Sequence, residues 1–261
     1  PSVSVASESQ NPLTPKPRER WIDVAKGIAI ILVVFLHSSF DYLGDSHVWR
    51  WEELSSILET FRMPLFFFTA GIFASGALSK SFRELLNTRV FRFAWLYVLW
   101  SVIGIFTIER LFVGFDGWGA FALEFLQMFV MPYGSTWFIY AIAVYFIAAW
   151  LIRKLPLILQ LVIGVAATIL FHYNLFTPPD SEWAKVGEYF LFFLLAVEFG
   201  PRLRRFVPTL RWWHTLIAPA VYVGLLVLLH ELGWIDAGDG SVKGMISWFA
   251  LSVLAVAAGS S

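Results

Sequence analysis

The first apolar segment of the chain carries three side chains that could transfer a proton or bind an anion. It covers residues 21–41, WIDVAKGIAIILVVFLHSSFD, and contains Asp23, Lys26 and His37. At about 100° per residue, an α-helix brings Lys26 and His37 to almost the same face, and Asp23 lies within roughly 40° of that face. Ionisable side chains inside a bilayer are costly and usually face a bundle interior or a water-filled path. The spacing therefore predicts a polar stripe along an otherwise apolar helix.

This stripe favours general base catalysis. Histidine has an unperturbed pKa of about 6.5, so His37 is the candidate base for a hydroxyl that attacks a thioester. Asp41, one helical turn later, is placed to fix the tautomer of His37, as the acid of a catalytic triad does. At ~1.5 Å per residue, Lys26 lies about 16 Å from His37 along the axis, which is roughly half of the hydrocarbon thickness. The two ends of the stripe therefore lie at different depths.

Five further residues are candidates for substrate binding. Arg62 is expected at a depth similar to that of His37, where it could bind substrate or stabilise an oxyanion. Arg89 and Arg92 lie on the same side as Lys26 and are candidates for phosphate binding. Glu124, in the middle of a short apolar segment, is a candidate for contact with an acceptor substrate. Trp137 is a candidate for lining the site.

Most of these residues also have a purely structural interpretation. His37 is also consistent with an interfacial residue near a helix end, and Asp23 with Lys26 is consistent with an ion pair at the membrane edge. Arg89 and Arg92 carry charge that any cytoplasmic loop is expected to have. Trp137 also fits the aromatic belt that anchors membrane helices at the interface. The sequence leaves both interpretations open for each.

The composition is that of a helical membrane protein that crosses the bilayer several times. Hydrophobic residues make up 58% of the chain and charged residues only 15%, with 13 Trp and 26 Phe. The net charge of zero gives no indication of a nucleic-acid partner. The absence of cysteine excludes disulfides, thiolate metal sites and cysteine nucleophiles. We expect neither a metal ion nor a bound cofactor.

The hydropathy and charge pattern predicts an all-α fold in one transmembrane domain, residues 21–261. Residues 1–20 are rich in Ser and Pro and are expected to form a flexible cytoplasmic tail. Basic segments within 78–92 and 202–211 are placed in the cytoplasm by the positive-inside tendency. Small residues near the end of the second span, Gly71 and Gly76 among them, favour close helix contact. About eight spans are predicted, at residues 22–40, 55–77, 93–108, 136–152, 156–172, 187–200, 212–230 and 244–258.

One further apolar segment, residues 117–131, is too short for a confident crossing. If this segment crossed the bilayer, Arg153 and Lys154 would lie outside the cell. We interpret it as a re-entrant or interfacial half-span, which places both residues in the cytoplasm and Glu124 within the half-span.

Four motifs in the first 150 residues resemble those of a large bacterial family of membrane acyltransferases, the acyltransferase type 3 family. The segment IDVAKGIAIILVVFLHS is similar to its opening signature, with Lys26 where many members have Arg. RMPLFFFTAG, at 62–71, resembles the second-helix segment. Arg89-Val-Phe-Arg92 resembles the cytoplasmic basic motif, without the proline that often follows it. STWFIYAIAVYFI, at 135–147, is similar to the helix start that contains Trp137.

The resemblance implies transfer of an acyl group, usually acetyl from acetyl-CoA, to a hydroxyl of an exported sugar or glycan, in the bacterial inner membrane. Lys26 and Asp23 would then meet the phosphates or pantetheine amide of acyl-CoA, and Arg89 and Arg92 its nucleotide phosphates. The implied partners are acyl-CoA, a sugar or glycan acceptor and the lipid bilayer. Members are usually described with about ten spans, so we expect this chain to be incomplete at its C-terminus.

Two other classes of function are compatible with the same residues. In a proton-coupled secondary transporter, Asp23, Lys26 and His37 would form a relay, although the sequence has no sign of inverted repeats or paired broken helices. The other class is a non-catalytic membrane partner or lipid-binding protein. Acyl transfer from acetyl-CoA separates the leading hypothesis from both.

Overall fold

The computed structural model describes residues 62–107, 117–175 and 182–206, and the isolated positions 27, 31, 220, 221, 224, 225, 228 and 232. Within these residues the secondary structure is helix and turn, without a strand, which confirms the all-α prediction. The predicted spans at 22–40, 212–230 and 244–258 lie almost entirely outside the described residues. Asp23, Lys26, His37 and Asp41 also lie outside them.

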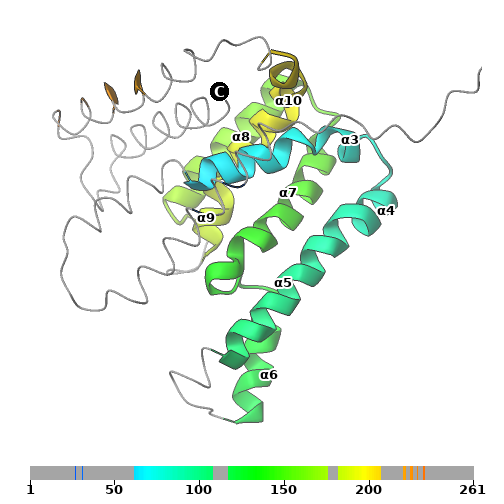
Figure 1. Ribbon diagram of the computed structural model, residues 1–261, viewed down its shortest axis with the longest axis vertical. Helices are drawn as coiled ribbons and strands as arrows, with labels where there is room; N and C mark the ends of the chain where they lie inside the picture. The colour runs from blue at the N-terminus through cyan, green and yellow to red at the C-terminus, as the bar shows by residue number, and fades with distance from the viewer. Residues whose placement is uncertain are drawn as a thin grey trace, which may run out of the picture.

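The described helices lie side by side in a bundle (Figure 1). In chain order they are the helix Arg62–Ile72, α3 (Ser75–Leu78), α4 (Phe82–Leu85), the π-helical turn η1 (Leu86–Val90), α5 (Phe91–Gly104), α6 (Trp118–Gln127), the 3₁₀ turn η3 (Gly134–Thr136), α7 (Trp137–Ile152), α8 (Leu157–His172), α9 (Trp183–Glu188) and α10 (Phe190–Phe206).

One continuous helix, Phe82–Thr107, contains α4, η1 and α5 and is long enough to cross a membrane. It has 26 residues and a mean hydropathy of 1.7, and only 22% of its most apolar stretch of 18 residues is buried inside the protein. At ~1.5 Å per residue it is about 39 Å long. Trp95 and Trp100 are exposed on its outer surface, as expected for side chains that face lipid. It is the one described helix that meets the length requirement. The helices Arg62–Ile72, Trp137–Ile152 and Leu157–His172 are apolar but shorter.

The long helix corrects the predicted boundary of the third span. The third span was expected to begin at residue 93, but the helix already begins at Phe82. Ser81 caps it by accepting a hydrogen bond from the backbone N–H of Glu84, at 3.3 Å. Leu85 and Val90 are buried on its inner face, so packing extends the helix through a segment whose charge alone favoured a loop.

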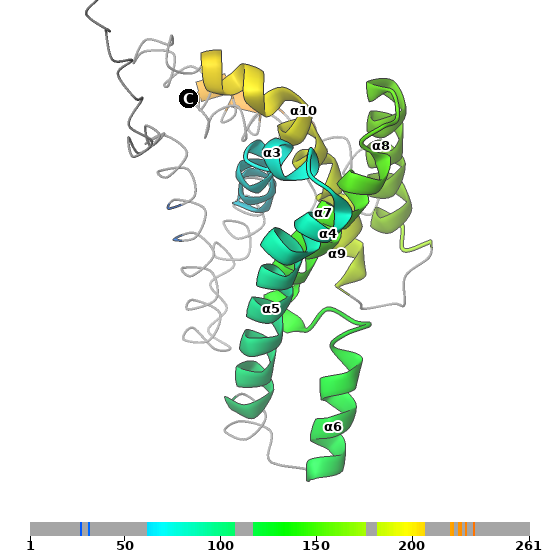
Figure 2. The same ribbon diagram turned by 90° about the vertical axis from the view of Figure 1, so that its right-hand side faces the viewer.

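Helices α6 and α7 run one after the other along α5, in the opposite direction (Figure 2). Phe121 of α6 contacts Phe106 at the far end of the long helix, and Phe146 of α7 contacts Phe93 near the start of α5. Since α6 has 10 residues and a length of about 15 Å, it covers only part of a bilayer. The short length of α6 agrees with the short apolar segment that was identified within 117–131.

The connection between α6 and α7 is held by side-chain hydrogen bonds. The Tyr97 hydroxyl donates to the carbonyl oxygen of Met128 at 2.7 Å and accepts from the backbone N–H of Tyr133 at 2.9 Å. The indole N–H of Trp183 donates to the carbonyl oxygen of Val130 at 2.8 Å. Non-helical backbone at membrane depth is tolerated where the protein satisfies its polar groups. These hydrogen bonds satisfy backbone groups of the non-helical connection beside the middle of α5.

Aromatic and small residues form the core. Phe67 packs against Trp137, Tyr145 and Tyr189, with ring centroids 5.0–5.7 Å apart. Gly71 lies so close to α10 that a Cβ atom there would be 2.5 Å from the carbonyl oxygen of Phe193. The expected close helix contact is therefore confirmed at Gly71.

The predicted span at 187–200 is divided and longer than expected. It begins within α9, is interrupted at Tyr189, and continues in α10, which passes through Pro201 to Phe206. At the interruption, Nδ1 of His172 lies 2.7 Å from Oε1 of Glu188, which ties the end of α8 to the end of α9.

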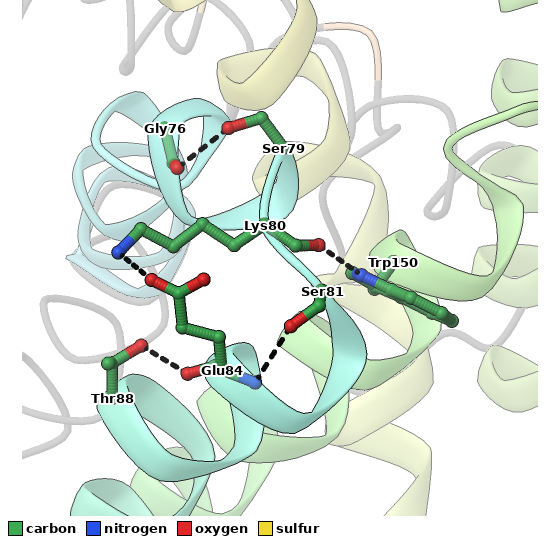
Figure 3. A network of polar contacts seen from close by, with 7 residues as sticks. All are labelled: Gly76, Ser79, Lys80, Ser81, Glu84, Thr88 and Trp150. Carbon is green, nitrogen blue, oxygen red and sulfur yellow. Dashed lines mark hydrogen bonds and ion pairs between the residues drawn. The ribbon is translucent and has the colours of Figure 1, made fainter.

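Three basic segments meet at one end of the bundle, which we call the basic end. It contains Lys80, Arg89 and Arg92, then Arg153 and Lys154, and finally Arg204 of α10. The indole N–H of Trp150 donates to the carbonyl oxygen of Lys80 at 3.0 Å, which places the end of α7 beside the start of α4 (Figure 3). The guanidinium carbon of Arg204, near the end of α10, lies 5.4 Å from the ring centroid of Phe73 in the same region. The sequence interpretation that put these segments on one side of the membrane matches this arrangement.

Candidate functional site

A cavity of about 350 Å³ opens at the basic end and contains two of the predicted site residues. Arg89 and Arg92 line it together with Lys80, Thr88, Phe73, Gly76 and Ala77. The residues come from the turn before α3, from α3 itself, from the turn after it and from the first turns of the long helix. The cavity therefore brings three cationic side chains to one concave surface.

The π-helical turn η1 presents these cations to the cavity. Arg89 lies within η1 and Arg92 within the first turn of α5. A π-turn adds one residue to a helical turn and often occurs at functional sites. The hydroxyl of Thr88 donates to the carbonyl oxygen of Glu84 at 2.7 Å, which satisfies a backbone acceptor of the widened turn (Figure 3).

The three cations differ in their electrostatic partners. Lys80 forms a 2.5 Å ion pair with Glu84, and both side chains are exposed. Neither Arg89 nor Arg92 has a hydrogen bond or ion pair within the described part of the chain. An arginine presents its donors in a rigid planar fork that fits phosphate oxygens. Both guanidinium groups can therefore bind an anion in the cavity.

Gly76 forms part of the cavity wall without being a packing contact. It is exposed, and a Cβ atom at this position would meet no heavy atom within 4 Å. Sequence reasoning grouped Gly76 with Gly71 as a residue for close helix contact, and the structure shows this to be wrong for Gly76. Space beside a glycine cannot be read from a small-residue pattern, because the pattern does not say which face has a neighbouring helix.

Arg62 is buried at the start of the helix Arg62–Ile72, with 6% of its surface exposed. The helix runs from Arg62 towards Phe73, which lines the cavity at the basic end. Eleven residues at ~1.5 Å each place Arg62 about 16 Å from the level of Phe73. The structure thus places Arg62 and the two cavity arginines at separate depths of the same bundle.

Trp137 belongs to the buried aromatic core and is 8% exposed. Its ring stacks on Tyr189 at a centroid distance of 5.7 Å, and Nζ of Lys185 lies 5.9 Å from its centroid. An aromatic belt residue faces lipid and headgroups, so the belt interpretation of Trp137 is wrong. Its burial depends on Tyr189, 52 residues later in the chain (189 − 137), which no local pattern could indicate.

Glu124 is partly buried on α6. This helix lies beside the end of α5 that is opposite to α4 (Figure 2). The structure therefore separates Glu124 from Arg89 and Arg92. No group of three His, Asp or Glu side chains within the described ranges could hold a metal ion.

Sequence reasoning did not single out Lys80, Thr88 or Gly76 as site residues, although all three line the cavity. The available signal was the clustering of Lys80, Arg89 and Arg92 within one short segment. That cluster was interpreted as a cytoplasmic loop, and a loop gives no basis for choosing which neighbours share a surface.

The similarity of this chain to known proteins covers more of the sequence than the four motifs in its first 150 residues. Residues 19–260 match the sequence profile of an acyltransferase domain, the acyltransferase type 3 domain. The chain is also 27% identical over 165 residues to the inner membrane protein YcfT of Escherichia coli (strain K12), in an alignment that covers 54% of this chain and 46% of YcfT. The chain thus matches about half the length of this relative. No solved structure is significantly similar. Because the family match covers nearly all of the sequence, the chain belongs to the acyltransferase type 3 family.

Proposed function

We propose that the chain is a membrane-embedded acyltransferase that moves an acyl group, acetyl in the simplest case, from acyl-CoA to a hydroxyl of a sugar or exported glycan. Family membership supports acyl transfer. The observation that carries the donor assignment is the cavity at the basic end, where Arg89 and Arg92 line one concave surface with no acidic partner among the described residues. No described feature favours the transporter alternative.

The nucleotide end of acyl-CoA provides the anions for this cavity. Its phosphate groups would accept charge-assisted hydrogen bonds from Arg89 and Arg92. Lys26, with Asp23 beside it, would bind the pantetheine arm or a further phosphate. The thioester would then reach along the polar stripe of the first span towards His37. The 16 Å between the levels of Phe73 and Arg62 is of the size that such an extended arm has to cover.

In the proposed reaction, the acceptor hydroxyl attacks the thioester carbonyl while His37 removes its proton. A C–O bond forms, the C–S bond breaks, and the proton passes from His37 to the leaving CoA thiolate, so that the products are the ester and free CoA. Asp41 holds the histidine tautomer. Arg62 stabilises the oxyanion or binds the acceptor, because a buried positive charge lowers the energy of developing negative charge.

Two further residues have proposed roles around the acceptor. Trp137 borders the acceptor site from its buried position next to Tyr189 and Lys185. Glu124 contacts acceptor hydroxyls from α6. The acceptor would enter from the end of the bundle opposite to the basic end.

The proposed topology places the basic end in the cytoplasm of a bacterial inner membrane protein. In this topology the protein has about eight spans, the half-span that contains α6, and a cytoplasmic N-terminus. The clustering of Lys80–Arg92, Arg153–Lys154 and the end of α10 supports it, because cytoplasmic segments carry an excess of Lys and Arg. The description of YcfT as an inner membrane protein also supports it.

Filling the cavity tests the donor site without removing a charge. Gly76→Leu places an aliphatic side chain in the cavity, where nothing lies within 4 Å of its Cβ. The leucine should keep the donor phosphates from at least one charge-assisted hydrogen bond with the cavity arginines. We therefore expect the KM for acetyl-CoA to rise at least about ten-fold, which corresponds to the loss of one such bond. Gly119→Leu is the matched control, since Gly119 is also helical and open but lies on α6. Release of free CoA and labelling of the acceptor are measured with purified protein. An unchanged KM for the Gly76 variant would contradict the donor assignment.

A further inference from the structure

A second cavity, of about 320 Å³, lies on the other side of α3 from the first. Its polar lining includes Arg153, Lys154, Gln160 and Glu198, and its apolar lining includes Leu194 and Val197. These residues come from the end of α7, the start of α8 and α10, and Ser75 and Leu78 of α3 also line the cavity, which makes it a junction between four helices. The cavity has no part in the acyl transfer proposed above.

The charges of this cavity are opposite in sign and do not pair with each other. Lys154 and Glu198 line the same space, yet neither forms an ion pair or a hydrogen bond within the described part of the chain. The ammonium nitrogen of Lys154 and the carboxylate oxygens of Glu198 are therefore more than 4.0 Å apart. A cation and a carboxylate held apart in one cavity are complementary to a ligand that carries both charges.

Two other polar side chains are held in place by the protein. The Arg153 guanidinium stacks 3.7 Å from the ring centroid of Trp150 and donates to the carbonyl oxygen of that residue at 3.0 Å. Gln160 is buried, and its Nε2 donates to the carbonyl oxygen of Leu155 at 2.9 Å. These contacts order both side chains before any ligand binds, which reduces the entropy that binding would cost.

The cavity lies where charged residues meet the apolar outer surface. Leu151, Leu155 and Leu157 are exposed directly beside Arg153 and Lys154, and Ile158 is 77% exposed. Large apolar side chains on the outer face of a membrane helix contact lipid. A ligand can therefore reach this cavity from the interfacial layer of the bilayer, with its polar part in the cavity and its chains along α8.

We propose that this cavity binds the headgroup of a zwitterionic phospholipid with a primary amine, that is, a phosphoethanolamine headgroup. Arg153 and Lys154 bind the phosphate, and Glu198 accepts hydrogen bonds from the ammonium group. The first methylenes of the lipid pack against Leu194 and Val197. A purely anionic headgroup fits less well, because it has no ammonium group to donate to Glu198 and leaves that carboxylate without a cationic partner. A trimethylammonium headgroup carries the positive charge but has no N–H to donate.

The preference among lipids tests the proposal on the unmutated full chain. Protein purified in detergent is incubated with equal amounts of phosphatidylethanolamine, phosphatidylcholine and phosphatidylglycerol, and the bound lipids are counted by native mass spectrometry. We expect retention of phosphatidylethanolamine to exceed that of each of the other two by roughly ten-fold, the value of one charge-assisted hydrogen bond. Equal or stronger retention of phosphatidylglycerol would overturn the proposal, and so would displacement of the lipid by CoA.

Two variants then assign the contacts. Glu198→Gln should remove the preference for phosphatidylethanolamine over phosphatidylcholine, while both lipids still bind. Lys154→Gln should weaken both lipids. Glu182→Gln is the matched control, because Glu182 already pairs with Lys185 at 2.8 Å and lies at the start of α9, away from this cavity. The assignment of Glu198 fails if the preference survives its substitution, or if Glu182→Gln removes it equally.

Discussion

Removal of Arg89 or Arg92 should weaken the binding of acetyl-CoA and leave the chemical step unchanged. Both guanidinium groups line the cavity at the basic end, and neither has a partner among the described residues. Substitution by Gln therefore breaks no described contact within the protein. The loss of affinity would be the loss of contacts with the donor.

The expected rise in KM depends on how exposed each arginine side chain is. Arg89 is partly buried, so its hydrogen bonds to a phosphate should contribute the usual 1.5–3 kcal/mol of a charge-assisted bond, or about ten- to one-hundred-fold in KM. Arg92 is exposed, and solvent screening should reduce its effect to roughly three- to ten-fold. Since the phosphates are remote from the thioester, their contacts stabilise the ground state and the transition state equally. The KM should therefore rise while kcat stays constant.

The assay is the release of free CoA from acetyl-CoA by purified Arg89→Gln and Arg92→Gln variants, over a range of donor concentrations and of salt. Arg83→Gln is the matched control, because Arg83 lies on the same helix and is exposed but does not line the cavity. Arg89→Lys should give an intermediate KM, since lysine keeps the charge but not the planar fork. A wild-type KM in the Arg89 and Arg92 variants would rule out this role of the two arginines, and so would an equal rise in KM in Arg83→Gln.

Two predictions concern the scaffold. Gly71→Ala should lower the free energy of unfolding by about 1–3 kcal/mol, because the new Cβ would lie 2.5 Å from the carbonyl oxygen of Phe193 and force α10 away. Thermal unfolding in detergent measures this, with Gly119→Ala as the control at an open glycine, and equal melting temperatures for the two variants would contradict it. Tyr97→Phe should destabilise the protein by about 1–3 kcal/mol, because the carbonyl of Met128 loses its buried donor. Hydrogen exchange should rise first in residues 128–133, and unchanged protection of that segment would show that the hydroxyl does not hold it.

Much of the architecture could be predicted from composition and hydropathy, because a chain so rich in apolar residues has few alternatives to a helical membrane fold. The short segment around α6 and the common location of the basic segments also followed from length and charge. The start of the long helix could not be predicted from length and charge. Charge at Arg83 and Arg89 indicated a loop, whereas the Ser81 cap and the burial of Leu85 favour a helix.

The site was predictable by residue type more than by geometry. The motif that contains Arg89 and Arg92 pointed to phosphate binding, and the structure places both in one cavity. The shape of that cavity depends on a π-helical turn and on Gly76, and neither follows from a local pattern. The burial of Trp137 depends on Tyr189, which is distant in sequence. Contacts of this kind become visible only once the helices are packed.

In the proposed mechanism, acyl-CoA binds at the basic end and His37 removes the proton of the acceptor hydroxyl. The most direct measurement compares acetyl-CoA binding with acetyl transfer to the glycan acceptor in the purified His37→Gln variant. We expect wild-type affinity for acetyl-CoA, as measured by equilibrium binding, together with a loss of transfer of about 10²–10⁴-fold. Acetyl transfer by His37→Gln at the wild-type rate would contradict this mechanism.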